Sequence, residues 1–141
     1  MILLDTNIFL ELLLDQKNAS RCERLLEQVA EGKIEAVVTR FSVHAVEAIL
    51  GKSKDVARFL RNVDASVGLV VYNTSNSDEM AATILQENTK LDFDDALQYY
   101  VAKKLGLSAI VSFDGDFDGL DVKRIEPEAL KGPGKERETP S

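Results

Sequence analysis

The sequence contains very little cysteine and histidine, with one residue of each among its 141. Cys22 cannot form a disulfide within the chain, and its place in an apolar helical stripe with Leu25 and Val29 favours core packing over catalysis. His44 lies three residues before Glu47 in a predicted helix, which favours a surface or helix-packing role. The chain therefore offers little for chemistry that needs a cysteine nucleophile or a histidine base.

Long apolar runs are also missing. No stretch of about 18 uncharged apolar residues is present, and the start lacks the basic segment and small-residue cleavage site of a signal peptide. We therefore expect a soluble, cytoplasmic protein with no membrane partner.

The length and the apolar content of 45% suit one compact domain, expected over residues 1–130. Residues 131–141, KGPGKERETPS, carry almost nothing to bury and are expected to be a disordered C-terminal tail.

Basic residues are outnumbered, 17 to 24, so the formal charge is −7. Taken alone, this balance argues against nucleic acid as a ligand, because Lys and Arg normally supply the affinity for phosphates. The objection weakens if several carboxylates share a metal site, since two divalent cations would bring the net charge to about −3. The positions of the acids therefore matter more than their number.

Apolar periodicity predicts a regular alternation of short strands and helices. Asn18, Thr39 and either Thr74 or Ser75 are plausible helix caps. Helices of this length between strands favour an α/β open sandwich, with a mostly parallel sheet and helices on both faces. The predicted strands are 2–4, 34–38, 66–72, 108–113 and 120–125, and the predicted helices are 8–14, 19–31, 40–50, 54–62, 75–88 and 92–105.

Acidic residues from three separate segments should meet at one edge of this sheet. Asp5 ends the first strand, and Asp114 and Asp116 follow the fourth. The helix that feeds the fourth strand must begin at the same edge, which brings the pair Asp94 and Asp95 there. In open parallel sheets, ligands bind beyond the carboxyl ends of the strands.

Glu47 is placed less firmly, because it lies about two turns into its helix, roughly 10 Å along the axis from the second strand.

Clustered carboxylates raise one another's pKa and cannot all stay ionised without compensation. Mg²⁺ or Mn²⁺ is the natural compensation, and a pair of such ions can support hydrolysis of a phosphodiester. Each acid also has a simpler interpretation, since Asp5 can cap the turn after it and Asp94 can serve the helix dipole. Convergence from three segments is hard to explain by capping alone.

Two other sites fit less well. The segment DGDFDG matches the first positions of a calcium-binding EF-hand loop, but position 12 is Ile125 and a strand precedes the loop. A haloacid-dehalogenase-like phosphatase would need a second aspartate where Asn7 stands.

Four stretches in order resemble the PIN-domain nucleases, including the VapC-type toxins: LLDTNIFL, TRFSVHAVEAIL, FDDALQYYVAKKLG and IVSFDGDFDGL. The similarity covers roughly residues 1 to 127. It implies a sheet of four to five strands in the order 3-2-1-4-5, which puts Asp5 beside Asp114. It also implies a set of catalytic acids, supporting polar residues and metal ligands. The acids are Asp5, Glu47, Asp95, Asp114 and Asp116, the supporting residues are Thr6, Asn7 and Ser112, and the metal ligands are Asp5, Asp95 and Asp114, with Asp94 as an alternative to Asp95.

The resemblance implies a Mg²⁺- or Mn²⁺-dependent endoribonuclease that hydrolyses single-stranded RNA, the toxin of a toxin–antitoxin pair. Expected partners are a small antitoxin protein and a second copy of the chain. A noncatalytic RNA- or protein-binding module with the same fold is the alternative, and a phosphohydrolase acting on small phosphoesters is a third. The basic cluster Lys52, Lys54, Arg58 and Arg61 could guide RNA, although a solvated helix face explains it more easily.

Overall fold

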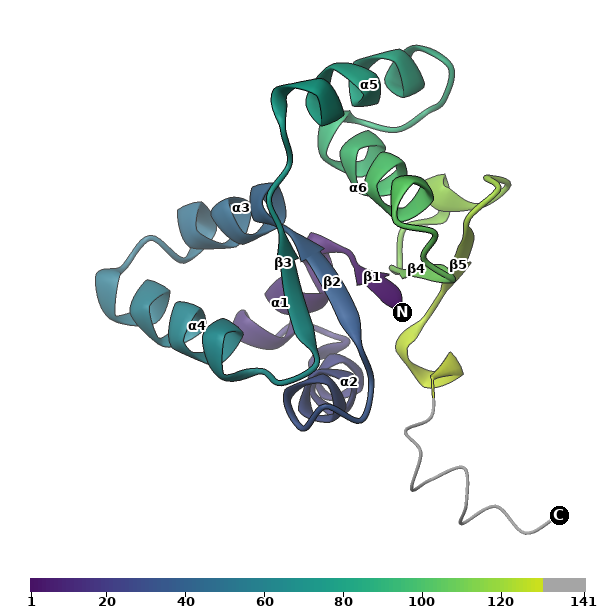
Figure 1. Ribbon diagram of the computed structural model, residues 1–141. Helices are drawn as coiled ribbons and strands as arrows, with labels where there is room; N and C mark the ends of the chain where they lie inside the picture. The colour runs from purple at the N-terminus through teal and green to yellow at the C-terminus, as the bar shows by residue number, and fades with distance from the viewer. Residues whose placement is uncertain (131–141) are drawn as a thin grey trace, which may run out of the picture.

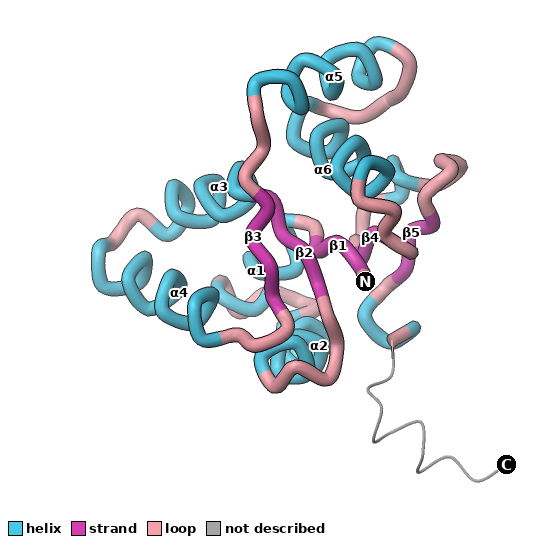
Figure 2. Tube along the Cα trace, in the orientation of Figure 1, coloured by secondary structure: helices cyan, strands magenta, loops and turns pink. Residues whose placement is uncertain are grey.

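Five short parallel strands form a single sheet in the computed structural model, which describes residues 1–130. Their order is β3-β2-β1-β4-β5, as the resemblance implied, so the first strand is central (Figure 2). Leu3 of the first strand lies between Val37 and Ile110 of its two neighbours. The strands are β1 (Ile2–Leu4), β2 (Ala36–Thr39), β3 (Leu69–Tyr72), β4 (Ala109–Val111) and β5 (Lys123–Ile125).

Helices cover both faces of the sheet, and Figure 1 shows α5 and α6 set apart from the other helices. One buried cluster unites side chains from α1 to α4, and a second unites those from α5, α6 and η1. The helices are α1 (Thr6–Leu13), α2 (Ala19–Ala30), α3 (Arg40–Leu50), α4 (Ser53–Ala65), α5 (Asn76–Glu87) and α6 (Phe93–Lys104), with short 3₁₀ turns η1 (Gly115–Phe117) and η2 (Pro127–Ala129).

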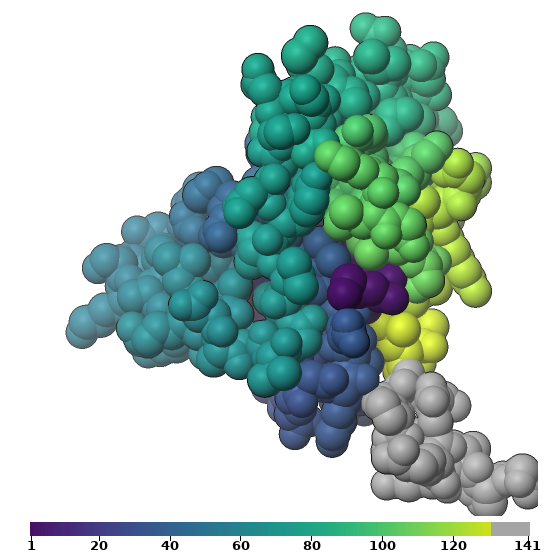
Figure 3. All heavy atoms as spheres, viewed as in Figure 1, coloured from purple at the N-terminus to yellow at the C-terminus, as the bar shows by residue number. Residues whose placement is uncertain are grey.

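The alternation of side chains along β1 divides the core between the two faces. Ile2 and Leu4 join the cluster beneath α1 to α4, whereas Leu3 joins the cluster beneath α5 and α6. All three are buried, and each such side chain contributes about 1.5 to 3 kcal/mol relative to exposure. Little of this strand reaches the surface in Figure 3, where later segments surround the start of the chain. This packing fixes the position of Asp5, the next residue.

Four of the five strands are shorter than the sequence predicts, and backbone hydrogen bonds account for the late starts of two of them, β3 and β2. The predicted strand over 66–72 begins only at Leu69, because Val67 and Gly68 donate backbone hydrogen bonds to the end of α2. A Cβ atom on Gly68 would lie 2.3 Å from the carbonyl oxygen of Ile34, so only glycine fits this turn. Ile34 itself bonds back to Gln28, and β2 accordingly starts at Ala36.

The cap predictions have mixed outcomes. Thr39 caps α3 by accepting a hydrogen bond from the Ser42 amide, and Ser75 forms a capping box at α5. The prediction for Asn18 is wrong: it occupies the N-cap position of α2, but its side-chain oxygen accepts from Arg21 instead. Cys22 is buried in the core, which confirms its packing role.

Within residues 1–130, no helix is both long and apolar enough to cross a membrane. The predicted tail, residues 131–141, lies outside the described residues.

Candidate functional site

Asp5 is a buried carboxylate that does not cap a helix. It occupies the N-cap position of α1 with only 3% of its surface exposed, yet its side chain makes no capping hydrogen bond. Instead, Oδ2 accepts a hydrogen bond of 2.7 Å from the hydroxyl of Ser112, and Oδ1 accepts one of 3.1 Å from Nε2 of Gln98. Side chains from β1, α6 and the end of β4 therefore converge here, and the capping interpretation of Asp5 is wrong.

Asp94 is fixed by a line of buried hydroxyl groups. Its Oδ2 lies 3.0 Å from Oγ1 of Thr6, which in turn lies 2.7 Å from the hydroxyl of Ser42. Ser42 also contacts Thr39, at 3.0 Å. The line runs from the end of β2 through α3 and α1 to the first turn of α6, so helices on opposite faces of the sheet are connected at its carboxyl edge.

The cap of α6 is a different acid, Asp92, whose side chain accepts a hydrogen bond from the amide of Asp95. Asp94 and Asp95 are therefore not needed as caps. No side-chain hydrogen bond holds the Asp95 carboxylate among the residues that the structure describes, whereas one oxygen of Asp94 is engaged by Thr6.

The carboxyl groups at this edge disfavour one another's ionisation. Burial raises the pKa of Asp5, and the charge of Asp114 raises it further, while the bonds from Ser112 and Gln98 oppose the rise. The pKa of Asp94 is also raised, chiefly by burial. The pKa of Asp95 rises to about 8, through burial and then through the charges of Asp5, Asp92, Asp94 and Asp114.

Two buried oxygen atoms in this cluster have no hydrogen-bond partner, Oδ1 of Asp94 and Oε1 of Gln98. Such atoms cost about 1 to 3 kcal/mol each, and their presence often marks the place of a water molecule or an ion. Gln98 is fully buried, and the sequence reasoning missed it. The available signal was one amide inside the apolar run from Ala96 to Ala102.

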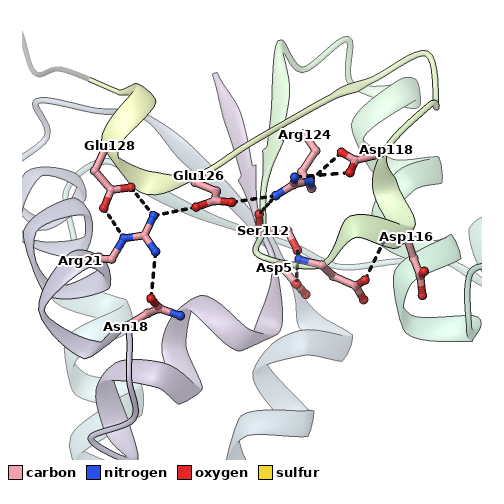
Figure 4. A network of polar contacts seen from close by, with 10 residues as sticks. Asp5, Asn18, Arg21, Ser112, Asp116, Asp118, Arg124, Glu126 and Glu128 are labelled. Carbon is pink, nitrogen blue, oxygen red and sulfur yellow. Dashed lines mark hydrogen bonds and ion pairs between the residues drawn. The ribbon is translucent and has the colours of Figure 1, made fainter.

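Among the predicted residues within 1–130, only Ser112 makes a side-chain hydrogen bond to Asp5, and three of the others are exposed or engaged elsewhere. Glu47, on α3, pairs with His44 at 3.3 Å. Asn7 is exposed, and Asp116 is exposed too, contributing its backbone N–H to Oδ1 of Asp114 (Figure 4).

The carboxylate and amide oxygens at this edge suit a hard cation, although they do not form a complete coordination site by themselves. Within residues 1–130, no three His, Cys, Asp or Glu side chains lie close enough together to hold an ion as they stand. Mg²⁺ and Mn²⁺, however, take only one or two protein carboxylates each and complete their coordination with water and substrate oxygens. Mutually repelling carboxylates and two unpartnered oxygens fit such an ion.

An apolar cavity of about 320 Å³ lies elsewhere, between α1, α2 and α4. Phe9, Leu26 and Phe59 are among its lining residues, and none of the candidate acids is. It is separate from the acid cluster.

Comparisons with known proteins agree with this architecture. A family model described as PIN domain matches residues 2–123. A chain of a toxin–antitoxin complex from Klebsiella pneumoniae superposes with a TM-score of 0.71 at 19% identity, covering 90% of this chain and 98% of that one. VapC20 of Mycobacterium tuberculosis, a toxin that cleaves the sarcin–ricin loop, gives 0.68 at 17%, covering 86% and 96%. FitAcB from Neisseria gonorrhoeae gives 0.65 at 18%, covering 92% and 100%.

The comparison with curated proteins gives no match. At these identities, the structural likeness establishes a common fold.

Proposed function

Because the chain belongs to the PIN-domain family, we propose that it is a divalent-metal-dependent endoribonuclease that hydrolyses phosphodiester bonds in single-stranded RNA. The observation that carries this proposal is the buried Asp5 carboxylate, which Ser112 and Gln98 hold without its capping α1, and whose pKa is raised by burial and by the charge of Asp114. A buried carboxylate with a raised pKa, at the carboxyl edge of a parallel sheet, is in the position where such folds bind ligands and carry out catalysis.

Asp5, Asp95 and Asp114 are the residues proposed to hold Mg²⁺ or Mn²⁺. When bound there, such an ion would supply an activated water and would stabilise the charge that develops on phosphate oxygens. Asp95 is preferred to Asp94 because no side-chain bond among the described residues engages its carboxylate, whereas Thr6 engages Asp94. In this proposal, Ser112 and Gln98 orient Asp5, and Thr6 orients the start of α6.

Glu47, Asp116 and Asn7 remain in the proposed acid and supporting set on the strength of the family resemblance alone. Glu47 and Asp116 would act from the rim of the cluster.

We further propose that the protein is the toxin of a toxin–antitoxin pair, acts in the cytoplasm and has a small antitoxin as its partner. The likeness to a chain of the toxin–antitoxin complex from Klebsiella pneumoniae supports this proposal. A homodimer is proposed as well, supported by large apolar side chains left exposed on α3 and α5, namely Ile49, Met80 and Ile84.

The direct test is cleavage of labelled single-stranded RNA in the presence of Mn²⁺. We expect product from the parent protein, none after addition of EDTA and none from Asp5→Asn. Asp64→Asn is the matched control, since Asp64 is an exposed aspartate on α4, and we expect it to cleave RNA like the parent.

Other outcomes would point to the other functions. RNA that is bound but stays intact would contradict the nuclease and favour the noncatalytic binding module. Turnover of a chromogenic phosphomonoester, lost in Asp5→Asn, together with intact RNA, would favour a phosphohydrolase.

A further inference from the structure

Arg124, on β5, makes contacts that reach the acid cluster, although it carries no carboxylate and no predicted role. One guanidinium nitrogen, NH1, donates a hydrogen bond of 3.0 Å to the backbone carbonyl of Ser112. Nε donates one of 2.7 Å to Asp118, and NH2 adds a longer one of 3.4 Å to its second oxygen. A contact of 3.2 Å to Glu126 completes the set (Figure 4). The side chain is only 19% exposed.

The Ser112 carbonyl needs this donor because the sheet cannot supply one. The Ser112 amide donates to the carbonyl of Ile125, which continues the parallel pairing of β4 with β5. In a parallel ladder, the Ser112 carbonyl would then accept from the amide of residue 127. That residue is Pro127, which has no N–H. The guanidinium of Arg124 occupies the place of the missing ladder bond.

Arg124 thereby holds both ends of the segment 112–118, which carries two of the proposed acids. At the first end, Ser112 donates its hydroxyl to Asp5 and accepts from the amide of Asp114. At the other end, the amide of Asp118 bonds to the carbonyl of Gly115 and closes η1. The guanidinium of Arg124 thus fixes the distance between the Ser112 hydroxyl and the turn η1, which begins directly after Asp114.

We propose that Arg124 is a positioning residue, which fixes the segment 112–118 so that Ser112 and Asp114 keep their places beside Asp5. It acts through Ser112 and Asp118 and touches neither Asp5 nor Asp114 by any contact of the described chain. Its consequence for catalysis rests on the proposed nuclease function, whereas its effect on the segment 112–118 does not.

The chain offers a matched control in Arg21, on α2. Arg21 also binds Glu126, at 2.7 Å, and it pairs with Glu128 in the same multidentate manner (Figure 4). Its side chain is 30% exposed, close to the value for Arg124. Arg21 contacts neither Ser112 nor Asp118 in the described structure. Its guanidinium does lie 4.9 Å from the centre of the Phe113 ring, inside the segment 112–118, and the methionine of Arg21→Met can still pack on that ring. A general effect of losing a buried or half-buried arginine would therefore affect both variants, whereas loss of the bonds to Ser112 and Asp118 affects only Arg124→Met.

The first measurement is amide hydrogen exchange, followed residue by residue, and it needs no RNA. In Arg124→Met, we expect exchange at the amides of Asp114, Asp116 and Asp118 to accelerate about tenfold or more, while Leu4 and Val101 in the core stay unchanged. In Arg21→Met, all five amides should exchange as in the parent. Because this result does not depend on activity, it separates a wrong positioning role from a wrong function.

The second measurement is the steady-state rate on labelled RNA with Mn²⁺. We expect Arg124→Met to lower kcat by about 10- to 100-fold, as loss of a supporting residue behind metal ligands commonly does, with little change in KM. Arg124→Lys should stay similarly impaired, because one ammonium cannot reproduce the planar fork that reaches both Ser112 and Asp118. Arg21→Met should keep the parent kcat.

Three results would overturn the proposal: unchanged exchange at all three amides in Arg124→Met, full recovery of kcat in Arg124→Lys, or an equal loss in Arg21→Met. If Arg124→Met fails to fold, Asp118→Asn replaces it. That variant removes the charged acceptor of Nε and should accelerate exchange at Asp116 and Asp118 more than at Asp114. Equal exchange in Asp118→Asn and the parent would likewise contradict the role.

Discussion

Gln98, on α6, is one of the two side chains that hold the Asp5 carboxylate. Its amide is fully buried, holds Asp5 through Nε2 and leaves Oε1 without a partner. In Gln98→Leu, we expect cleavage of RNA to fall about 10- to 100-fold, because Asp5 loses one of its two side-chain donors. Stability should change by less than about 1 kcal/mol, since the unpartnered carbonyl disappears together with the bond.

Urea unfolding and initial cleavage rates on the same preparations would test this expectation. Gln28→Leu serves as the control, because Gln28 also has a buried, unpartnered Oε1 but lies on α2, away from the acids. A Gln98→Leu protein that cleaves RNA at the parent rate would contradict a role for this amide.

Asp95 should make the metal-free protein less stable as the pH rises. Its pKa in the folded state is about 8, above the usual 3.8, so folding favours its protonated form. This contribution is fully present below about pH 4 and is lost as the pH rises through 8. At pH 8 in EDTA, we expect Asp95→Asn to be more stable than the parent by about 1 to 2 kcal/mol, because solvent screens a partly exposed carboxylate and reduces the full effect.

The measurement is urea unfolding between pH 5 and 8.5 in EDTA. The difference between parent and variant should shrink toward pH 5. A difference that is constant across this range would contradict the assignment of the raised pKa to Asp95.

At the residue scale, the sequence indicates the sheet edge at which Asp5, Asp95 and Asp114 lie, because Asp5 and Asp114 follow strands and Asp95 lies in the first turn of α6. Gln98 and Ser42 could not be placed in this way. Their roles depend on which face of α6 and α3 turns toward β1, and a lone polar residue in an apolar stripe does not reveal its partner. The role of Arg124 could not be predicted for a similar reason, because it binds the backbone carbonyl of Ser112, which follows a different strand.

At the scale of elements, α5 and α6 are joined by one buried carboxylate, Asp78. It accepts hydrogen bonds from the Ser75 amide in the capping box and from the Tyr72 hydroxyl, and it pairs with Lys104 at 2.7 Å. The bond to Lys104 and those to Ser75 and Tyr72 lower its pKa to about 2. We expect Asp78→Ala to cost about 2 to 3 kcal/mol at pH 7, combining a charged hydrogen bond with loss of a cap.

The free energy of unfolding, measured in urea at several pH values, tests this prediction. Because the folded pKa is depressed, the contribution is present above pH 4 and lost as the pH falls toward 2. The gap between parent and variant should therefore close in acid. Glu79→Ala, in the same first turn, is the control, and an equal loss there would show that general charge at the start of α5 is responsible.

The boundaries of the elements were less predictable than their order. Valine-rich runs indicate where strands lie, but Val67 and Gly68 do not join β3 because their backbone amides bond to the end of α2. Asn18 illustrates the same limit: a residue type that often caps helices instead accepts from Arg21, which is itself held by Glu126 and Glu128 far along the sequence. Local patterns cannot anticipate such distant partners.

At the scale of the whole molecule, a divalent ion that binds only the folded state should stabilise it. The expected gain is about 2.7 kcal/mol when Mn²⁺ is present at 100 times its Kd. In Asp5→Asn most of this gain should vanish, while the metal-free variant should be as stable as the parent or more so, because burial and neighbouring charge disfavour the ionised carboxyl.

Thermal unfolding with and without Mn²⁺ measures the effect, with Asp64→Asn expected to respond like the parent. A melting temperature of the parent that does not change with Mn²⁺ would count against a metal site at the acid cluster.

The central place of β1 also governs when the acid cluster can form during synthesis of the chain. β1 is translated before both of its neighbours in the sheet, and one of them, β4, follows it by more than a hundred residues. Because chains grow at about 5 to 20 residues per second, several seconds separate translation of Asp5 from that of Ser112 and Asp114. A chain whose synthesis stops before residue 112 therefore lacks Ser112 and Asp114, and the acid cluster can assemble only after both have been translated.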